Sequence, residues 1–567
     1  MSEQTLGPPA GELPHRVRGA DAKRSVAWLA FLFALSTFVW FASLGVRCLV
    51  DTDEGRYAVL ALEMARSGDL ITPRLNGLLY FEKPPLQYWI GALSFRWFGI
   101  TEFAARLWPG LAGFLTVLAV GGTATRLWGK TSGLQAFAVA ASMTWIIAVS
   151  HVLTLDAGLT LFLTLTLCAV LLVECAQLEP PTRRRCIWVA WVSTALAVLS
   201  KGPVGFVIPA CALLLASLWM RDLALLRRMR PAAGLLIMLV VAAPWFVLVS
   251  LRNPGFAEFF FIHEHVARYL TEVHQRVGAW WYYIPLLLIG MVPWTGALPW
   301  ILRRDRSVAA PTETRAVRIL AAWCGFVLLF FSFSGSKLPS YILPMFPALA
   351  LLVTLQLRGA GTSLLRWHLL VPAVAWLAVL IASTQAYRLG SAETPRAVVV
   401  SLGWALCVAA VLFLAGALVA FWCLGRRHVT AAVLSVALGH FIAMAVVIQG
   451  YDSYGQLKSA AAMSKVLLPL LGPDSPVFAV RMYDQTLPFY LRRDVVLVDF
   501  AGEFAFGQQH EPAKAPATLD QFIVRWQSLP RGAAAVMRRD TQRELVERGV
   551  PIRVVFEDPR RLVVMKP

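Results

Sequence analysis

Three carboxylates, Asp51, Asp53 and Glu54, follow an apolar run from Val26 to Val46 that is long enough to span a bilayer. They therefore lie where the chain leaves lipid for water. A helix N-terminus is one explanation, because acids in the first turn suit the helix dipole. Asp156, between two further apolar runs, is either a helix cap or functional, because an acid in apolar surroundings is costly. Together they predict an active-site rim at a membrane face, with Asp53, Asp156 and Glu54 as catalytic candidates.

Basic residues expected at the same face are candidates to bind an anion. Lys201 in LSKGPVG and Lys337 in SGSKLPSY interrupt apolar sequence in tight Gly- and Pro-containing turns, which fix the direction of each side chain. Snorkelling to lipid headgroups is the alternative explanation. Several converging cations at a membrane rim would suit a phosphate or pyrophosphate. The phosphate-binding candidates are Lys83, Arg268, Lys201 and Arg56.

A long aromatic loop, residues 256–283, holds several histidines and acids and is expected to dip against the bilayer surface. His263 and His265, with Glu82 as a third ligand, are candidates to hold a divalent ion such as zinc. His-x-His spacing is also common in amphipathic surface segments, so both explanations stay open. Candidates to line a sugar or lipid pocket, with interface anchoring as the alternative, are Tyr57, Tyr80, Tyr341 and Lys337.

Two local elements would position these groups. Tyr57, Leu60, Ala61 and Met64 recur at helical spacing and Gly68 provides a stop, so a short amphipathic helix is expected along the membrane surface. The segment from Tyr80 to Pro85 is expected to be extended, because each proline restricts its own backbone and that of the residue before it.

The composition is that of a polytopic α-helical membrane protein. Of the 567 residues, 58% are hydrophobic and only 15% are charged, whereas soluble domains carry about 25% charged residues. The net charge of +19 is therefore attributed to basic loops beside the membrane spans, and no nucleic-acid partner is expected. The eight cysteines lie in or beside apolar segments without a CxxC motif, which argues against a disulfide framework.

About thirteen segments are candidates to span the membrane. If the N-terminus is cytoplasmic, the loops on the cytoplasmic side are basic, as expected for such loops. The loops that mix acids, bases, histidines and aromatics then lie on the outer face. Residues 1–24 are expected to be a disordered cytoplasmic tail. The candidate spans centre on 26–46, 108–127, 132–150, 157–174, 187–200, 204–220, 233–251, 283–301, 319–334, 341–357, 369–387, 398–424 and 429–447.

The composition changes near residue 450. We expect a membrane catalytic domain over 25–450, with outer-face loops 51–106 and 252–282, and a small α/β domain over 451–567 on the outer face. That domain is predicted from short apolar strands alternating with helix-like stretches such as 518–527. No GxGxxG or P-loop motif occurs. The predicted strands are 477–480, 495–498, 533–536, 553–556 and 562–565.

Seven sequence motifs resemble those of the polyprenyl-phosphate-dependent membrane glycosyltransferases. This family includes protein O-mannosyltransferases and the bacterial aminoarabinose transferases that act on lipid A, and the chain is most similar to the latter. The resemblance covers residues 25–350 at the level of motifs and the remainder by layout. The motifs are DEGRYA, GDLITPRLNGLLYFEKPPLQYW, FAARLWPGL, LTLDAGLT, LSKGPVG, FFFIHEHVARYL and SGSKLPSYILP.

The resemblance implies a GT-C-type fold in the bacterial inner membrane, with the active site facing the periplasm. It implies inverting transfer of 4-amino-4-deoxy-L-arabinose from undecaprenyl phosphate to a lipid A phosphate, by a monomer among membrane lipids that requires no cofactor. Lys83, Arg268 and Lys201 would hold the donor phosphate and stabilise its charge as it leaves. Asp53 matches the family's catalytic acid and Asp156 a second acid near the same pocket.

Other functions remain open at this point. A related enzyme would move another sugar to a protein Ser or Thr, a glycan or a lipid, and Asp53 would then act as general base for a hydroxyl acceptor. The Asp53-Glu54 pair also occurs in the mannosyltransferases, so it does not separate the acceptors. A flippase or transporter is a remote alternative. Such proteins place ionisable residues near the bilayer midplane and carry internal repeats, whereas the ionisable residues here are expected at one membrane face and no repeat is found.

Overall fold

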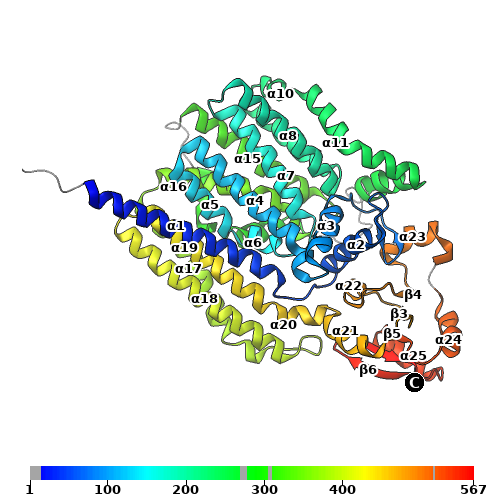
Figure 1. Ribbon diagram of the computed structural model, residues 1–567. Coiled ribbons are helices and arrows are strands. Elements are labelled where there is room, and N and C mark those ends of the chain that lie inside the picture. The colour runs from blue at the N-terminus through cyan, green and yellow to red at the C-terminus, as the bar shows by residue number, and fades with distance from the viewer. Residues whose placement is uncertain (1–14, 268–277, 304–309, 515–516) are drawn as a thin grey trace, which may run out of the picture.

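The computed structural model describes residues 15–267, 278–303, 310–514 and 517–567. A bundle of long helices forms one part of the molecule, and a smaller sheet domain built from the C-terminal residues lies at one end of it (Figure 1). We call this end of the bundle the domain end. The predicted fold class, a polytopic helical membrane protein with a C-terminal α/β domain, is confirmed.

Nine helices in the described ranges are long and apolar enough to cross a membrane. Several expose large apolar side chains, such as Leu251 on α11 and Trp422 on α18, as expected for helices that face lipid. The nine are α1 (His15–Ala42), α4 (Glu102–Trp128), α7 (Asp156–Cys175), α11 (Pro231–Arg252), α15 (Pro311–Phe333), α16 (Phe346–Gly359, preceded by the 3-10 turn η4, Pro339–Met345), α17 (Thr362–Ser383), α18 (Arg396–Gly425) and α19 (Val429–Gly450).

Two segments that the sequence predicted as single spans are broken. The first bends by 60° between α5 (Lys130–Ser142) and α6 (Thr144–Ser150). The second bends by 111° between α13 (Tyr283–Gly290) and the turn η3 (Thr295–Ala297) with α14 (Leu298–Arg303). The described residues thus hold nine such helices, or eleven when each bent pair counts as one span. Two further predicted spans correspond to α8 (Pro180–Lys201) and the shorter apolar helix α9 (Val204–Met220).

The two breaks lie against each other and satisfy each other's polar groups. The backbone N–H and the hydroxyl of Thr144 both donate to the carbonyl of Val292, at 3.0 and 3.1 Å. The indole N–H of Trp294 donates to the hydroxyl of Ser142 at 2.9 Å. Non-helical backbone at membrane depth is stable only when its polar groups are satisfied within the protein. We call this contact the break joint.

The predicted short helix near the N-terminus is α2 (Asp53–Ser67). Gly68 ends it in the left-handed region, at φ 71°, with its N–H donating to the carbonyl of Met64. α2 packs between α3 (Leu86–Phe98) and the C-terminal domain, and its position along the membrane surface stays a prediction. Gly55 marks the closest approach, since a Cβ there would lie 2.4 Å from the carbonyl carbon of Gln485.

A two-stranded hairpin follows α2 and anchors the C-terminal domain. Its strands are β1 (Arg74–Leu75) and β2 (Leu78–Leu79), joined by Asn76 and Gly77 at φ 51° and 76°. Asn-Gly is the preferred pair for such a turn. The Asn76 side chain donates to the carbonyl of Val495 and accepts from its N–H, both at 2.8 Å, as a strand neighbour would.

The C-terminal domain contains a five-stranded sheet in the order β4-β3-β5-β7-β6. β3 lies parallel to β4 and β5, and β7 lies antiparallel to β5 and β6. One face packs against α24 (Leu519–Ser528) through Phe522 and Trp526, and the other joins the apolar core of α2. Every predicted strand is present: β3 (Val477–Val480), β4 (Val496–Val498), β5 (Ala534–Met537), β6 (Arg553–Glu557) and β7 (Leu562–Met565).

Glu63 on α2 makes the stability of the domain contact pH-dependent. Its carboxylate accepts from the N–H of Gly77 at 3.1 Å, and burial together with the charge of Asp494 raises the pKa of Glu63 to about 8. The folded protein therefore holds this proton more tightly than the unfolded chain. The stabilisation is fully present below the ordinary pKa of 4.5 and is lost as the pH rises through about 8.

We therefore expect Glu63→Gln to raise the Tm by about 2–4 °C at pH 9 and to change it little at pH 5. Gln keeps an oxygen for the N–H of Gly77 and carries no charge. Thermal unfolding of the detergent-solubilised protein at both pH values is the measurement. Glu547→Gln, on the exposed surface of α25 (Arg539–Glu547), is the control. Equal effects of Glu63→Gln at the two pH values would contradict the assignment.

Candidate active site

The candidate site lies at the domain end, where α2, α7, α8 and the C-terminal domain meet (Figure 1). At the bottom of the site, the carboxylate of Glu54 is held between the guanidinium groups of Arg47 and Arg106, and we call these three residues the bracket. Arg47 and Arg106 each contact both carboxylate oxygens, at 2.7 to 2.9 Å, and the N–H groups of Val50 and Leu153 donate at 3.0 and 2.9 Å. Glu54 is only 1% exposed.

This environment gives Glu54 a structural role in place of the catalytic role expected from the sequence. Burial alone would raise the pKa of Glu54, but the guanidinium groups of Arg106 and Arg47 hold it well below its usual range. Each carboxylate oxygen accepts three hydrogen bonds, so its capacity to accept from a substrate is used up. The bracket fixes the N-terminus of α2 and thereby the position of Asp53.

Asp53 is the first residue of α2 and its side chain is 38% exposed. It pairs with Arg56, one turn further along, at 3.3 Å. Arg56 is buried and also pairs with Glu503 of the C-terminal domain at 3.2 Å. Burial alone would lower the pKa of Arg56, but the surrounding Tyr80, Glu82, Glu503 and Asp53 raise it well above its usual range.

Unpartnered polar atoms surround Arg56. Its Nε and the hydroxyls of Tyr80 and Tyr88 are buried with no hydrogen-bond partner in the part of the chain that the structure describes. Tyr57 stacks on Tyr88 with ring centroids 6.2 Å apart. Buried polar groups are normally satisfied, so this cluster is arranged for a polar ligand or bound water.

Asp156 and Lys201 form the second part of the site. Asp156 begins α7 and makes a buried ion pair with Lys201, the last residue of α8. The hydroxyl of Ser340 donates to the other oxygen of Asp156 at 2.9 Å. The ammonium of Lys201 lies 4.4 Å from the ring centre of Tyr341. Lys337, also from the segment before α16, donates to the carbonyl of Ser334 at 2.9 Å.

Lys83 forms the third part and is also nearly buried. Its ammonium donates to the carbonyl of Glu82 at 2.7 Å and lies 3.5 Å from Glu264 on the π-helix η2 (Glu258–Ala267). His263 contacts the other oxygen of Glu264 at 3.5 Å. Arg268 and the side chain of His265 lie outside the described residues. Among those described, no group of three His, Cys, Asp or Glu side chains is arranged to hold a metal ion, and the predicted metal site stays a prediction.

The C-terminal domain contributes two residues that the sequence did not single out. Glu503 reaches Arg56, and Phe506 on α23 (Ala505–His510) packs on Phe81 and Phe259 with ring centroids 5.5 and 4.5 Å apart. These contacts close the site on its domain side. Neither residue has a local sequence signal, because its partners lie more than 240 positions away along the chain.

Substitutions at Glu54 and at Asp53 are expected to affect the stability of the fold very differently. Glu54→Gln leaves two buried guanidinium groups without a counter-charge and is expected to cost about 3–5 kcal/mol. Asp53→Asn changes a partly exposed group and is expected to leave the unfolding temperature nearly unchanged. Thermal unfolding followed by tryptophan fluorescence compares these neighbouring variants. Equal stabilities would show that the bracket does not hold this end together.

Two family models match the chain on either side of its centre. Residues 26–266 match the model described as dolichyl-phosphate-mannose-protein mannosyltransferase. Residues 463–566 match the model described as aminoarabinose transferase C-terminal domain. The first model covers the segments that carry Asp53, Lys83, Asp156 and Lys201, and the second covers Glu503.

Curated relatives agree with both models. An undecaprenyl phosphate-alpha-4-amino-4-deoxy-L-arabinose arabinosyl transferase of Aeromonas salmonicida is 33% identical over 58% of this chain and 59% of its own length. The chain thus spans about three fifths of the first relatives that it matches. A relative with the same name from Pseudomonas paraeruginosa is 31% identical over 91% of this chain and 93% of its own length.

A solved structure is similar over nearly the whole chain. The crystal structure of ArnT from Cupriavidus metallidurans bound to undecaprenyl phosphate superposes with a TM-score of 0.90 at 34% identity. The superposition covers 95% of this chain and 98% of that one. With matching sequence and fold from the first span to the final strand, the chain belongs to the aminoarabinose transferase family of membrane glycosyltransferases.

Proposed function

We propose that this protein transfers 4-amino-4-deoxy-L-arabinose from undecaprenyl phosphate to a phosphate of lipid A. The reaction takes place at the periplasmic face of the bacterial inner membrane, where the domain end lies. The observation that carries the proposal is that nearly buried Lys83, Lys201 and Arg56, each paired with an acid, lie at the same end of the bundle as the partly exposed Asp53. The whole-chain likeness to a protein bound to undecaprenyl phosphate supports the donor.

The two lysines suit a phosphate that leaves with negative charge. Each is shielded from water and paired with one acid, Lys83 with Glu264 and Lys201 with Asp156. Charge is stabilised more strongly in such a dry site than in water. As the bond between the anomeric carbon and the phosphate oxygen breaks, undecaprenyl phosphate departs with the electron pair, and these cations stabilise it. Arg268 is expected to act with them.

The surroundings of Arg56 suit an amino sugar. Three carboxylates, those of Asp53, Glu82 and Glu503, surround this single guanidinium. The excess of negative charge favours a cation, which the protonated amine of the sugar supplies. The unpartnered hydroxyls of Tyr80 and Tyr88 offer hydrogen bonds to a sugar.

The acceptor determines the role of Asp53. A lipid A phosphate is already anionic, so it attacks the anomeric carbon without losing a proton, in one displacement that inverts the configuration. Asp53 then orients the reacting groups. A protein hydroxyl would require Asp53 as general base. The acceptor phosphate and the donor are both lipid-linked, and a monomer that spans the membrane many times brings them to one face.

The first test is transfer of the aminosugar from its undecaprenyl phosphate to lipid A by the purified protein, read by mass spectrometry. We expect lipid A to gain one aminosugar, and Asp53→Asn to reduce the rate by about 10²-fold. Asp474→Asn, on the exposed surface of the C-terminal domain, is the matched control. Transfer to a Ser- or Thr-containing peptide but not to lipid A would overturn the assigned acceptor.

The second test concerns Lys201. Lys201→Met removes a cation from the donor phosphate, and we expect the KM for the donor to rise at least tenfold with the KM for lipid A unchanged. Lys201→Arg is expected to recover part of the loss because it keeps the charge. Steady-state kinetics with each substrate varied in turn measures both effects. An unchanged KM for the donor with Lys201→Met would place the phosphate elsewhere.

A further inference from the structure

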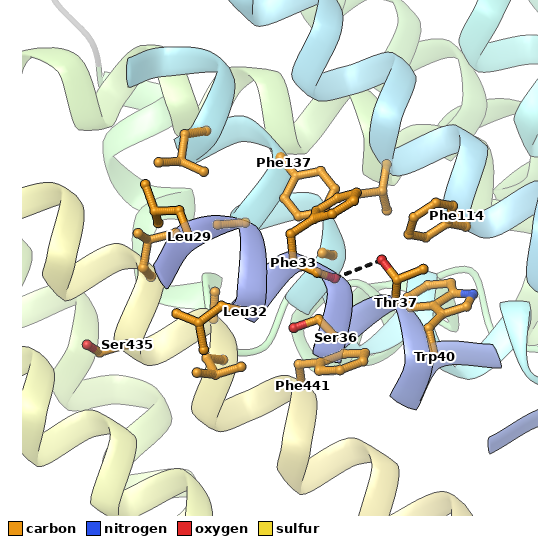
Figure 2. A pocket seen from close by; sticks show the side chains of 17 residues that line it. Leu29, Leu32, Phe33, Ser36, Thr37, Trp40, Phe114, Phe137, Ser435 and Phe441 are labelled. Atoms are coloured by element: carbon orange, nitrogen blue, oxygen red, sulfur yellow. Dashed lines mark hydrogen bonds between the residues drawn. The ribbon is translucent and has the colours of Figure 1, made fainter. Parts of the chain in front are cut away.

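An apolar groove of about 310 Å³ lies between α1, α4, α5 and α19 (Figure 2). Its polar side-chain atoms are the hydroxyls of Ser36, Thr37 and Ser435 and the indole N–H of Trp40. Three of the four are satisfied by backbone carbonyls: Thr37 donates to Phe33 at 2.8 Å, Trp40 to Gly110 at 2.9 Å and Ser435 to Ala431 at 2.9 Å. Much of the wall is aromatic, from Phe33, Trp40, Phe114, Phe137 and Phe441.

The chemistry of the wall calls for an apolar occupant. Protein interiors are closely packed, and an apolar cavity does not hold water well because water finds no partners there. The volume falls within the range of small-molecule pockets. The groove is partly open on the side of α1, whose residues beyond Ala27 are largely exposed. A flexible hydrocarbon chain entering from the bilayer meets all of these conditions.

The length of the groove matches one leaflet. Along α1 it extends from Leu29 to Trp40, which at 1.5 Å per residue is about 16 Å. The hydrocarbon core of a bilayer is about 30 Å thick, so this is close to half of it. Trp40 marks the end nearer the site, because the chain leaves α1 after Ala42 and reaches Asp53 eleven residues later.

A chain of contacts joins that end of the groove to the site. The ring of His151 packs on Trp40 with centroids 4.9 Å apart, and its Nε2 lies 3.1 Å from the Trp40 carbonyl. The carbonyl of His151 accepts from Arg47 at 2.6 Å, and Arg47 holds Glu54 next to Asp53. A lipid with one chain in the groove therefore has its headgroup at the level of Asp53.

A cation for the headgroup is present at the same level. The carbonyl of Lys458 accepts from the N–H of Asp51 at 2.8 Å, so this residue lies beside the segment that leads into α2. Its ammonium lies 5.1 Å from the ring centre of Tyr454, and the residue is half-buried. A lysine at a membrane rim suits the phosphate of an anionic lipid.

We propose that this groove holds one acyl chain of the acceptor lipid, with its phosphorylated headgroup directed to Asp53. The inference rests on the proposed function and extends it to how the acceptor is bound. The donor is expected on the opposite flank: α5 packs on α4, α4 on α7, and α7 on α8, which carries Lys201 (Figure 1). The two lipids then approach the site from different sides of the bundle and do not compete for one groove.

Filling the groove tests the proposal. Ser36 lines it, whereas Ala34 lies two residues earlier on α1 with its side chain exposed. We expect Ser36→Trp to raise the KM for hexa-acylated lipid A at least fivefold. The KM for its fully deacylated form and the KM for the donor should stay unchanged. Ala34→Trp places the same side chain outside the groove and is expected to leave all three values unchanged.

Two results would overturn the proposal. If Ser36→Trp raises the KM for the donor instead, the groove holds the carrier chain. If no KM changes while both variants remain folded, the groove is filled by bulk lipid. If the unmodified protein does not transfer the sugar to lipid A at all, the proposed function is contradicted. The groove proposal is tested separately, by comparing KM values between acceptors and between variants.

A binding measurement covers the case in which Ser36→Trp fails to fold. Lipid A with a photoactivatable diazirine in an acyl chain is irradiated with the unmodified full-length protein, and the labelled peptides are identified by mass spectrometry. Labelling concentrated in residues 27–45, 102–128, 130–142 and 429–450 supports the proposal. Labelling spread evenly over all lipid-facing helices contradicts it. This measurement requires no sugar transfer, so it stands apart from the test of activity.

Discussion

The structure at the domain end depends on one buried carboxylate, Glu54, held between Arg47 and Arg106. Its six hydrogen bonds tie together the exit of α1, the first turns of α2 and α4, and the loop that leads to Asp156. A buried charge is tolerated only when it is paired and hydrogen-bonded, and removing one partner leaves the others uncompensated. Four separate segments of chain are therefore fixed to one another at a single point.

The C-terminal domain is part of this assembly. It covers α2 so closely that a methyl group at Gly55 would overlap the backbone at Gln485, and it adds Glu503 to the charges around Arg56. Phe506 fills the space beside Phe81 and Phe259. Two basic residues of α2, Arg56 and Arg66, pair with this domain, with Glu503 and with the carbonyl of Arg492.

Several features were predictable because their physical cause is local. Apolar spans, the five strands, the stop at Gly68 and the placing of Asp156 and Lys201 at the same end of their spans follow from periodicity, turn residues and the cost of charge in lipid. Other features depend on distant partners. The sequence does not distinguish Glu54, saturated by Arg106, from Asp53 beside it, and it contains no sign that Glu503 reaches Arg56. The bends at Met143 and Val292 also depend on a contact between two spans.

The break joint has a consequence for how the site responds to the bilayer. α6 runs from Thr144 towards Asp156, and α13 runs from Val292 back to Tyr283, whose hydroxyl donates to the carbonyl beside Lys337 at 3.2 Å. Both arms are only seven or eight residues long and share one origin inside the bundle. A thicker or thinner membrane is accommodated by tilting long helices. Asp156 and Lys337 are both positioned by arms that start at the break joint. The distance between them therefore does not depend on the tilt of the long helices or on the thickness of the membrane.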